Sequence, residues 1–230
     1  YRWTIDGYRV WAMRTSTDGD DSFIELFDAE GDWLATGTGG FTADPGSDTG
    51  FRPIIRWGSV LGQVRDGVAD IVWTLPGYNA GRFPSMEVFE LPFMITDAQS
   101  ASRAAWQFYE KHGRNEFREV RPLAVHVHDA GYLHTRERPV RTLEDFRGMK
   151  LRAPTRQTNK LLAALGATPV SMPVTGLADA MSKGVLDGAM VPWEVVPAVK
   201  VHEVARFHTE TDPNVPALYT AVFLFAMNPK

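Results

Sequence analysis

The chain has 230 residues, of which 44% are hydrophobic and 23% charged, and its formal net charge is −4. These are the proportions of a folded globular protein, and the negative charge gives no general attraction to nucleic acid or to anionic lipid. The absence of cysteine excludes disulfides and thiolate chemistry, and no apolar run approaches the roughly 20 residues of a membrane-spanning helix.

The first 58 residues or so differ in character from the rest. Short aromatic and β-branched runs, such as Tyr8 to Met13 and Phe23 to Phe27, alternate with turn-forming stretches such as Ser16 to Asp21. This alternation predicts antiparallel hairpins. We therefore expect residues 1–58 to form an atypical β-hairpin-rich segment, distinct from residues 59–230.

From about Ser59 onward, helical patterns alternate with short apolar strands, which is typical of an α/β sheet. The clearest helix runs from about Asp97 to His112, with Thr96 or Asp97 as N-cap and Gly113 at the C′ position. Further helices are expected over 158–165 and 177–183, and a capping-box turn over 142–146. The expected strands are 70–73, 123–128, 150–153, 169–172, 189–191, 205–208 and 219–227.

One local pattern occurs twice. A Gly-Val-x-Asp core, beginning at Gly67 and again at Gly184, stands where a helix gives way to a strand. Each copy leads to an aromatic, proline-bearing loop, and open α/β sheets place ligands beside loops at the carboxyl ends of their strands. The two loops would then face each other across a cleft, although such junctions are common enough to coincide by chance.

Arg152 is the strongest single candidate for a ligand contact. It lies near the end of the expected strand 150–153, where alternation places it on the face opposite Leu151. A guanidinium there can hold a carboxylate through two parallel hydrogen bonds, which lysine cannot do. Position alone also allows the alternative of a surface arginine.

A metal-dependent hydrolase is the alternative from another functional class. His126 and His128 are two residues apart on an expected strand, so they share a face and could ligate zinc or iron. A hydrolase would still need a third spaced ligand and a general base. No nucleophile elbow or His-Glu-x-x-His motif is present, and we expect no enzyme activity, cofactor or metal.

The residues match a known family over long stretches, in order and spacing. These are 63–78, Gly81-Arg-Phe-Pro84, Glu90-Leu-Pro-Phe93, 139–154, Leu165-Gly-Ala-Thr-Pro-Val170, and Val185-Leu-Asp-Gly188 leading to Pro192-Trp-Glu194. Over about residues 60–228 the chain resembles the solute-binding proteins of tripartite ATP-independent periplasmic (TRAP) transporters, in their DctP-like branch.

The resemblance implies a two-lobed α/β fold, the type II fold of periplasmic binding proteins. It implies periplasmic capture of a small organic monocarboxylate and its delivery to the subunits of a TRAP membrane permease. Arg152 stands at the position of the family's carboxylate-binding arginine. The other expected ligand-binding residues are Trp73, Tyr78, Tyr132, Val191, Trp193 and Glu194.

Two positions depart from the sialic-acid-binding members of the family. Tyr132 stands where those members have a second arginine, and Val191 replaces an amide residue before the loop proline. This less polar pocket favours a smaller or more apolar acid, including aromatic and hydroxy acids. Family members also carry a signal peptide, a first strand and helix, and further C-terminal helices that this sequence lacks, so we expect a truncated fold. A non-functional fragment is the remaining alternative.

Overall fold

A computed structural model describes residues 2–5, 8–15, 22–27, 33–37, 41–43, 55–57, 61–212 and 214–229. The chain divides into two compact units. Unit 1 comprises residues 1–74, 119–124 and 225–230, and unit 2 comprises residues 75–118 and 125–224. The two strands β8 and β14 pass from one unit to the other. The predicted division of the chain near residue 58 stays a prediction.

Two sheets belong to unit 1. The first is an antiparallel meander with the order β1-β2-β3-β4-β5, as the alternating sequence predicts. Its strands are Arg2–Ile5, Tyr8–Thr15, Ser22–Phe27, Trp33–Gly37 and Phe41–Ala43. The second has the order β6-β7-β14-β8, in which β6 and β7 are parallel. Its strands are Ile55–Trp57, Ile71–Thr74, Val222–Met227 and Arg121–Val127, and α1 (Leu61–Arg65) precedes β7.

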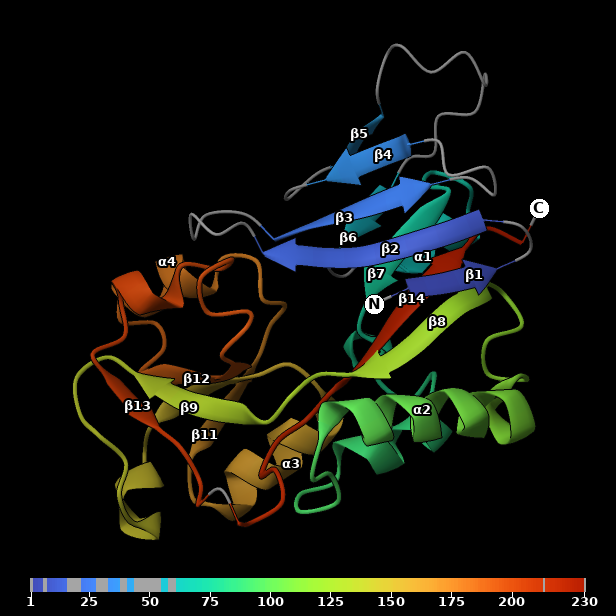
Figure 1. Cartoon of the computed structure of the whole chain (residues 1–230). Helices are drawn as coiled ribbons and strands as arrows, with labels where there is room; N and C mark the ends of the chain where they lie inside the picture. The colour runs from blue at the N-terminus through green and yellow to red at the C-terminus, as the bar shows by residue number, and fades with distance from the viewer. Residues whose placement is uncertain are drawn as a thin grey trace. The chain divides into compact units, whose positions relative to one another are not determined.

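The sheet of unit 2 has the order β11-β10-β12-β9-β13. Its strands are Thr168–Ser171, Lys150–Ala153, Gly188–Pro192, Gly131–Thr135 and Phe207–Thr209. Strands β11, β10 and β12 are parallel, whereas β9 runs antiparallel to both β12 and β13. Figure 1 shows strand β9 in yellow-green between the later, orange-red segments β12 and β13. Residues far apart in the sequence therefore meet on neighbouring strands.

The first helix of unit 2 begins at the predicted N-cap, Asp97, whereas the helix expected from residue 158 begins two residues earlier, after Thr155. Asp97 accepts a hydrogen bond from the Ser100 amide at 2.7 Å and begins α2 (Ala98–Phe108). Thr155 begins α3 (Arg156–Ala164), which packs on β10 and β11, and α4 is Leu177–Ser182. The 3-10 segments are η1 (Pro76–Tyr78), η2 (Pro84–Glu90), η4 (Leu143–Phe146) and η5 (Val201–Glu203). The capping box expected from Thr142 is confirmed at η4.

Two details of the predicted elements are wrong. Gly113 does not cap an α-helix in the left-handed conformation, because α2 instead widens into a π-helical turn, η3 (Tyr109–Gly113). Strand β9 was not anticipated. Four of its five residues are fully buried, so it lacks the alternation of polar and apolar residues by which a strand is recognised.

The repeated Gly-Val-x-Asp pattern has one local structure. Gly67 and Gly184 take positive φ angles of 75° and 72° after α1 and α4, a conformation that glycine adopts without steric penalty. The amide of Val68 donates to Gln63 O at 2.8 Å, and that of Val185 to Ala180 O at 2.9 Å. The two copies therefore end their helices in the same way, one in each unit.

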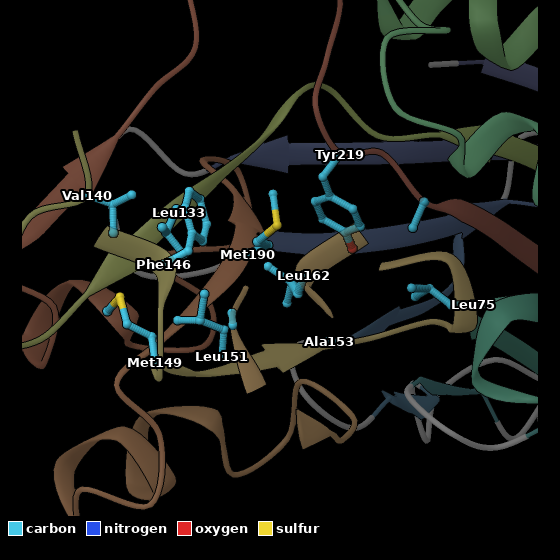
Figure 2. Close-up of a cluster of buried hydrophobic side chains, with 12 residues drawn as sticks. Leu75, Leu133, Val140, Phe146, Met149, Leu151, Ala153, Leu162, Met190 and Tyr219 are labelled. Atoms are coloured by element: carbon cyan, nitrogen blue, oxygen red, sulfur yellow. The ribbon is translucent and has the colours of Figure 1, made fainter. Parts of the chain in front are cut away.

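A hydrophobic cluster fixes the sheet of unit 2 (Figure 2). Leu151 and Leu162 are completely buried in it, and Met190 is 1% exposed. Other members are Leu75, Leu133, Val140, Phe146, Met149, Ala153, Ala167, Tyr219 and Ala221. Among the described helices, none has both the length and the apolar character needed to cross a bilayer.

Candidate carboxylate-binding site

The register of the sheet in unit 2 gives it two unlike faces. Arg152 on β10 is paired with Ala189 on β12, and Ala189 with His134 on β9. Val191 is paired with Tyr132, two residues along the same strands. Because paired residues point to the same side of a sheet and alternate along each strand, these side chains share one face. We call it the polar face.

The opposite face is the core face, formed by Leu151, Met190 and Leu133. Met190 and Leu133 are paired across β12 and β9, and all three side chains belong to the cluster of Figure 2. The alternation predicted between Leu151 and Arg152 is therefore confirmed. A single strand, β10, supplies one residue to the core and the next to the candidate site.

Arg152 is buried, with only 3% of its surface exposed, so it is not a surface arginine. Its Nε donates to Met172 O at 3.1 Å, its Nη1 to Met190 O at 3.3 Å and its Nη2 to Tyr78 Oη at 3.3 Å. All three acceptors are uncharged. Among the described residues, no carboxylate forms an ion pair with it.

The guanidinium keeps donors for a further partner. Three of its five N–H groups are used in these bonds, which leaves one on each terminal nitrogen. A guanidinium with an N–H on both terminal nitrogens can donate two parallel hydrogen bonds to a carboxylate. A buried charge without a counter-charge is unfavourable, so an anion would be stabilised here.

Tyr78 completes the contact with Arg152. It ends η1, and its hydroxyl oxygen accepts hydrogen bonds from Arg152 and from the amide of Val174, each at 3.3 Å. An oxygen that accepts twice still has its own hydrogen to donate. The loop before Tyr78 lies close to its neighbours, because a Cβ on Gly77 would overlap Thr155 and come within 3.0 Å of Glu90 Oε1.

Glu90 is a buried carboxyl group in the same unit, with 5% of its surface exposed. Burial raises its pKa to about 7, against the opposing effect of hydrogen bonds from the Thr155 hydroxyl and the Val222 amide. Its Oε2 has no hydrogen-bond partner among the described residues. Glu90 is therefore largely protonated in slightly acidic solution.

Tyr219 is a buried residue influenced by both Arg152 and Glu90. It is 3% exposed, and burial raises its pKa, while the positive charge of Arg152 lowers it and the carboxyl of Glu90 raises it. Tyr219 also packs over Gly131, where any Cβ would overlap its ring. The phenol thus remains neutral, and Gly131 is required by this close approach.

The aromatic loop after β12 extends over the polar face. Trp193 follows the last residue of the strand, is 40% exposed, and lies 6.5 Å from the ring of Tyr132. Val191 is 1% exposed, and its carbonyl accepts a hydrogen bond from His134 Nε2 at 2.9 Å. Glu194 follows at the surface, where partial desolvation still raises the pKa of its carboxyl group. The structure therefore brings Tyr132, Val191 and Trp193 together.

Trp73 lies elsewhere. It belongs to β7 in unit 1, where its ring stacks on Phe225 with 5.7 Å between centroids and 10° between planes. Leu123 and Ala124 complete this small cluster. Trp73 has the packing of a core residue within its own unit, and its role toward a ligand stays a prediction.

His126 and His128 share a face, as predicted, since both pack against Phe223. Burial lowers the pKa of His126 to about 3 and that of His128 to about 4. The Nε2 of His128 accepts a hydrogen bond from the Ala221 amide at 2.8 Å, and its Nδ1 therefore donates to the Asp129 carbonyl. Both nitrogens of His128 are thus used within the fold.

The described part of the chain holds no group of three His, Asp or Glu side chains able to bind a metal ion. The geometry gives no support to the hydrolase alternative. Sequence reasoning also missed Glu90, Tyr219, His134, His208 and Glu210 as parts of the site region. Of these, only Glu90 stands in a stretch that carried the resemblance, and nothing there pointed to its burial.

Comparison with known proteins identifies the family. The family model for bacterial extracellular solute-binding proteins, family 7 (DctP), matches residues 57–228. The chain belongs to this family. The match confirms the resemblance, the region it covers and the α/β periplasmic-binding-protein fold.

Several members of family 7 have known structures. A TRAP solute-binding protein from Rhodoferax ferrireducens T118, in complex with copurified benzoate, is 52% identical with a TM-score of 0.73, and the match covers 75% of this chain and 54% of that one. A second, from an unidentified marine microbe with co-crystallised 3-hydroxybenzoate, is 47% identical with a TM-score of 0.71. The match covers 74% of this chain and 53% of that one. One from Bordetella bronchiseptica, with bound mandelate, is 32% identical with a TM-score of 0.68, covering 73% and 53%.

The family 7 relatives are longer than this chain. A solute-binding protein of Albidiferax ferrireducens is 26% identical over 199 residues, which cover 84% of this chain and 56% of that protein. The sialic-acid-binding periplasmic protein of Vibrio cholerae is 28% identical over a match that covers 64% of this chain and 47% of that protein. The chain thus spans about half the length of the relatives it matches.

Proposed function

We propose that this chain is part of a periplasmic binding protein that captures a small aromatic monocarboxylate and delivers it to a TRAP membrane permease. The observation that carries the proposal is Arg152, a buried guanidinium whose partners among the described residues are all neutral and leave one N–H on each terminal nitrogen. Such a group is complementary to a carboxylate. The expected ligand-binding residues Arg152, Tyr78, Tyr132, Val191, Trp193, Glu194 and Trp73 take their roles from this proposal.

The aromatic character of the ligand is supported by two lines of argument. Tyr132 and Trp193 provide apolar surface beside the polar face, and small-ligand pockets usually combine such walls with few polar anchors. The solved relatives with benzoate and 3-hydroxybenzoate are 52% and 47% identical to this chain. The permease partner is proposed from the family alone.

Thermal denaturation with a matched pair of ligands tests the proposal. Benzoate and benzamide have nearly the same shape, but only benzoate is an anion. Benzoate at about 100 times its Kd stabilises a folded protein by about 2.7 kcal/mol, which raises the Tm of a chain of this size by about 5 to 10 °C. We expect benzamide to give no shift.

The same assay separates the ligand classes. We expect 3-hydroxybenzoate and mandelate to stabilise the protein, and sialic acid to have no effect because Tyr132 stands in place of the second arginine. A cooperative transition that no acid shifts would contradict the proposal. Equal shifts with benzoate and benzamide would contradict the role of Arg152.

A further inference from the structure

Four side chains form a connected group at the edge of the polar face. His134 on β9 and His208 on β13 are paired in the sheet register, and Trp193 and Glu210 directly follow β12 and β13. We call these four residues the Trp193 cluster. Three strands that are distant in the sequence therefore converge on one indole.

The strongest contact in the Trp193 cluster involves the indole N–H. Trp193 Nε1 donates to Glu210 Oε1 at 2.6 Å. A hydrogen bond to a carboxylate is shorter and stronger than one to a neutral acceptor. The indole has only this one polar hydrogen, so Glu210 determines where that edge of the ring points.

The two histidines support the indole from below. The ring centroid of Trp193 lies 4.8 Å from that of His134, at 76°, and 5.0 Å from that of His208, at 46°. The contact with His134 is edge-to-face and that with His208 is tilted, and both distances lie in the range of favourable contacts between rings. The indole is 40% exposed, and so without these contacts it would be free to change rotamer.

Hydrogen bonds fix the protons of the two histidines. A carbonyl oxygen only accepts, so His134 Nε2, 2.9 Å from Val191 O, carries a hydrogen. Burial lowers the pKa of His134, which keeps this ring neutral and leaves its Nδ1 as an acceptor. His208 Nδ1, at 2.7 Å from His134 Nδ1, must then be the donor. Each ring is held in one orientation.

We propose that Glu210 is a positioning residue: it holds Trp193, supported by the His134–His208 pair, in the orientation that contacts the ring of an aromatic acid. This inference rests on the proposed function, because it assumes an aromatic ligand at the polar face. Arg152 then binds the carboxylate, whereas Glu210 sets the selectivity for aromatic over aliphatic acids. Glu210 itself acts only through the indole.

The test compares three variants of the chain with wild type. Glu210→Leu removes the acceptor, Glu210→Gln keeps an uncharged acceptor, and Glu203→Leu removes an exposed glutamate of η5 as a control. We expect Glu210→Leu to weaken benzoate binding about ten-fold, the size of effect typical for a lost hydrogen bond to a charged group. Glu210→Gln should fall between Glu210→Leu and wild type, and Glu203→Leu should equal wild type.

Hexanoate provides the selectivity measurement, since it keeps the carboxylate and lacks the ring. Glu210→Leu should change its Kd less than two-fold. A double-mutant cycle with Trp193→Leu should then show no further effect of Glu210→Leu on benzoate binding. An equal loss for benzoate and hexanoate, or an effect that persists without the indole, would overturn the inference.

The ligand-free protein gives an independent readout. Near-ultraviolet circular dichroism should show a changed indole band in Glu210→Leu, and Trp193→Leu should abolish this difference. Wild-type protein that binds no acid would contradict the proposed function, yet this spectrum would still decide whether Glu210 holds Trp193. An unchanged spectrum in Glu210→Leu would overturn the inference even if benzoate binds.

Discussion

The two faces of one sheet in unit 2 illustrate two different uses of buried side chains. Leu151 and Met190 on the core face contribute by volume and apolar area alone, as buried members of the hydrophobic cluster (Figure 2). Arg152, one residue from Leu151, is nearly as well buried, and yet no carboxylate in the described part of the chain forms an ion pair with it. The core face is stabilised by the packing of its own side chains, whereas the charge of Arg152 on the polar face would be stabilised by a bound anion.

The largest expected effect is a loss of ligand affinity when Arg152 on the polar face is replaced. Replacing Arg152 by alanine removes both the charge and the paired donors, and the loss of one partner of a buried charge pair costs about 2 to 5 kcal/mol. The Kd for benzoate should rise by roughly 30-fold to several thousand-fold. Calorimetric titration measures this change.

Replacing Arg152 by lysine separates the effect of the charge from that of the paired donors. Arg152→Lys keeps the charge but loses the planar pair of donors, so we expect a clear loss of affinity as well. Circular dichroism must show that each variant is as folded as wild type. Equal affinities for the three proteins would mean that Arg152 does not bind the ligand.

The matching change on the core face should affect stability. Leu151 is completely buried, and Leu151→Ala would leave a cavity at a cost of about 2 to 5 kcal/mol in the free energy of unfolding. Urea denaturation should show a lower midpoint with an unchanged slope. A loss of less than about 1 kcal/mol in the free energy of unfolding would contradict the close packing around Leu151.

Buried groups that titrate extend the comparison to pH. Glu90 has a pKa of about 7 in the folded protein, above its usual value, so its favourable contribution is present below pH 4.5 and is lost as the pH rises through about 7. We expect Glu90→Gln to be more stable than wild type at pH 8, by on the order of a few kcal/mol at most. Denaturant midpoints of wild type and Glu90→Gln at pH 5 and pH 8 measure this difference in stability.

The buried histidines act in the opposite direction. Burial lowers the pKa of His126 to about 3 and of His128 to about 4, so their contribution is present above pH 6.5 and is lost as the pH falls through these values. The acid side of the stability profile should therefore be the same in wild type and Glu90→Gln. If Glu90→Gln changed the stability equally on the acid and the alkaline side of the pH profile, the loss of stability near pH 7 could not be assigned to Glu90.

The smallest expected effect comes from a nearby arginine that has a partner. Arg156 forms an ion pair with Glu87 at 2.8 Å, and its side chain is 44% exposed. Arg156→Ala should change stability by less than about 1 kcal/mol, because surface ion pairs contribute little, and should leave benzoate affinity unchanged. Arg156→Ala is therefore the control for Arg152→Ala. A large loss of benzoate affinity in Arg156→Ala would show that binding depends on positive charge in general and not on the contact with Arg152.

The local structure of the chain could be predicted where the signal is carried by a few neighbouring residues. The N-cap at Asp97, the capping box at Thr142 and the end of a helix before Gly184 are all found in the structure. Such signals depend on backbone hydrogen bonds within about one turn. The strand 150–153 and its alternation were predicted for the same reason.

The candidate site was predicted only in part. Arg152 was identified, but its position alone favoured a surface arginine, and its burial between strands β11 and β12 became evident only in the structure. Strand β9 was missed because both of its faces are buried, and with it the pairing of His134 with His208 and of Tyr132 with Val191. The resemblance to the family assigned Arg152 a role that its local sequence did not.

The sequence by itself determined the α/β character, the helix ends, the family and the arginine suited to a carboxylate. Only the tertiary structure decided which side chains face Arg152, that Glu90 is buried and neutral in mild acid, and that Glu210 holds Trp193. The reason is physical. Helix ends and alternation arise from contacts between near neighbours in the chain. A shared sheet face and the desolvation of a charge depend instead on strands far apart in the sequence, from 37 residues between Arg152 and Ala189 to 74 between His134 and His208.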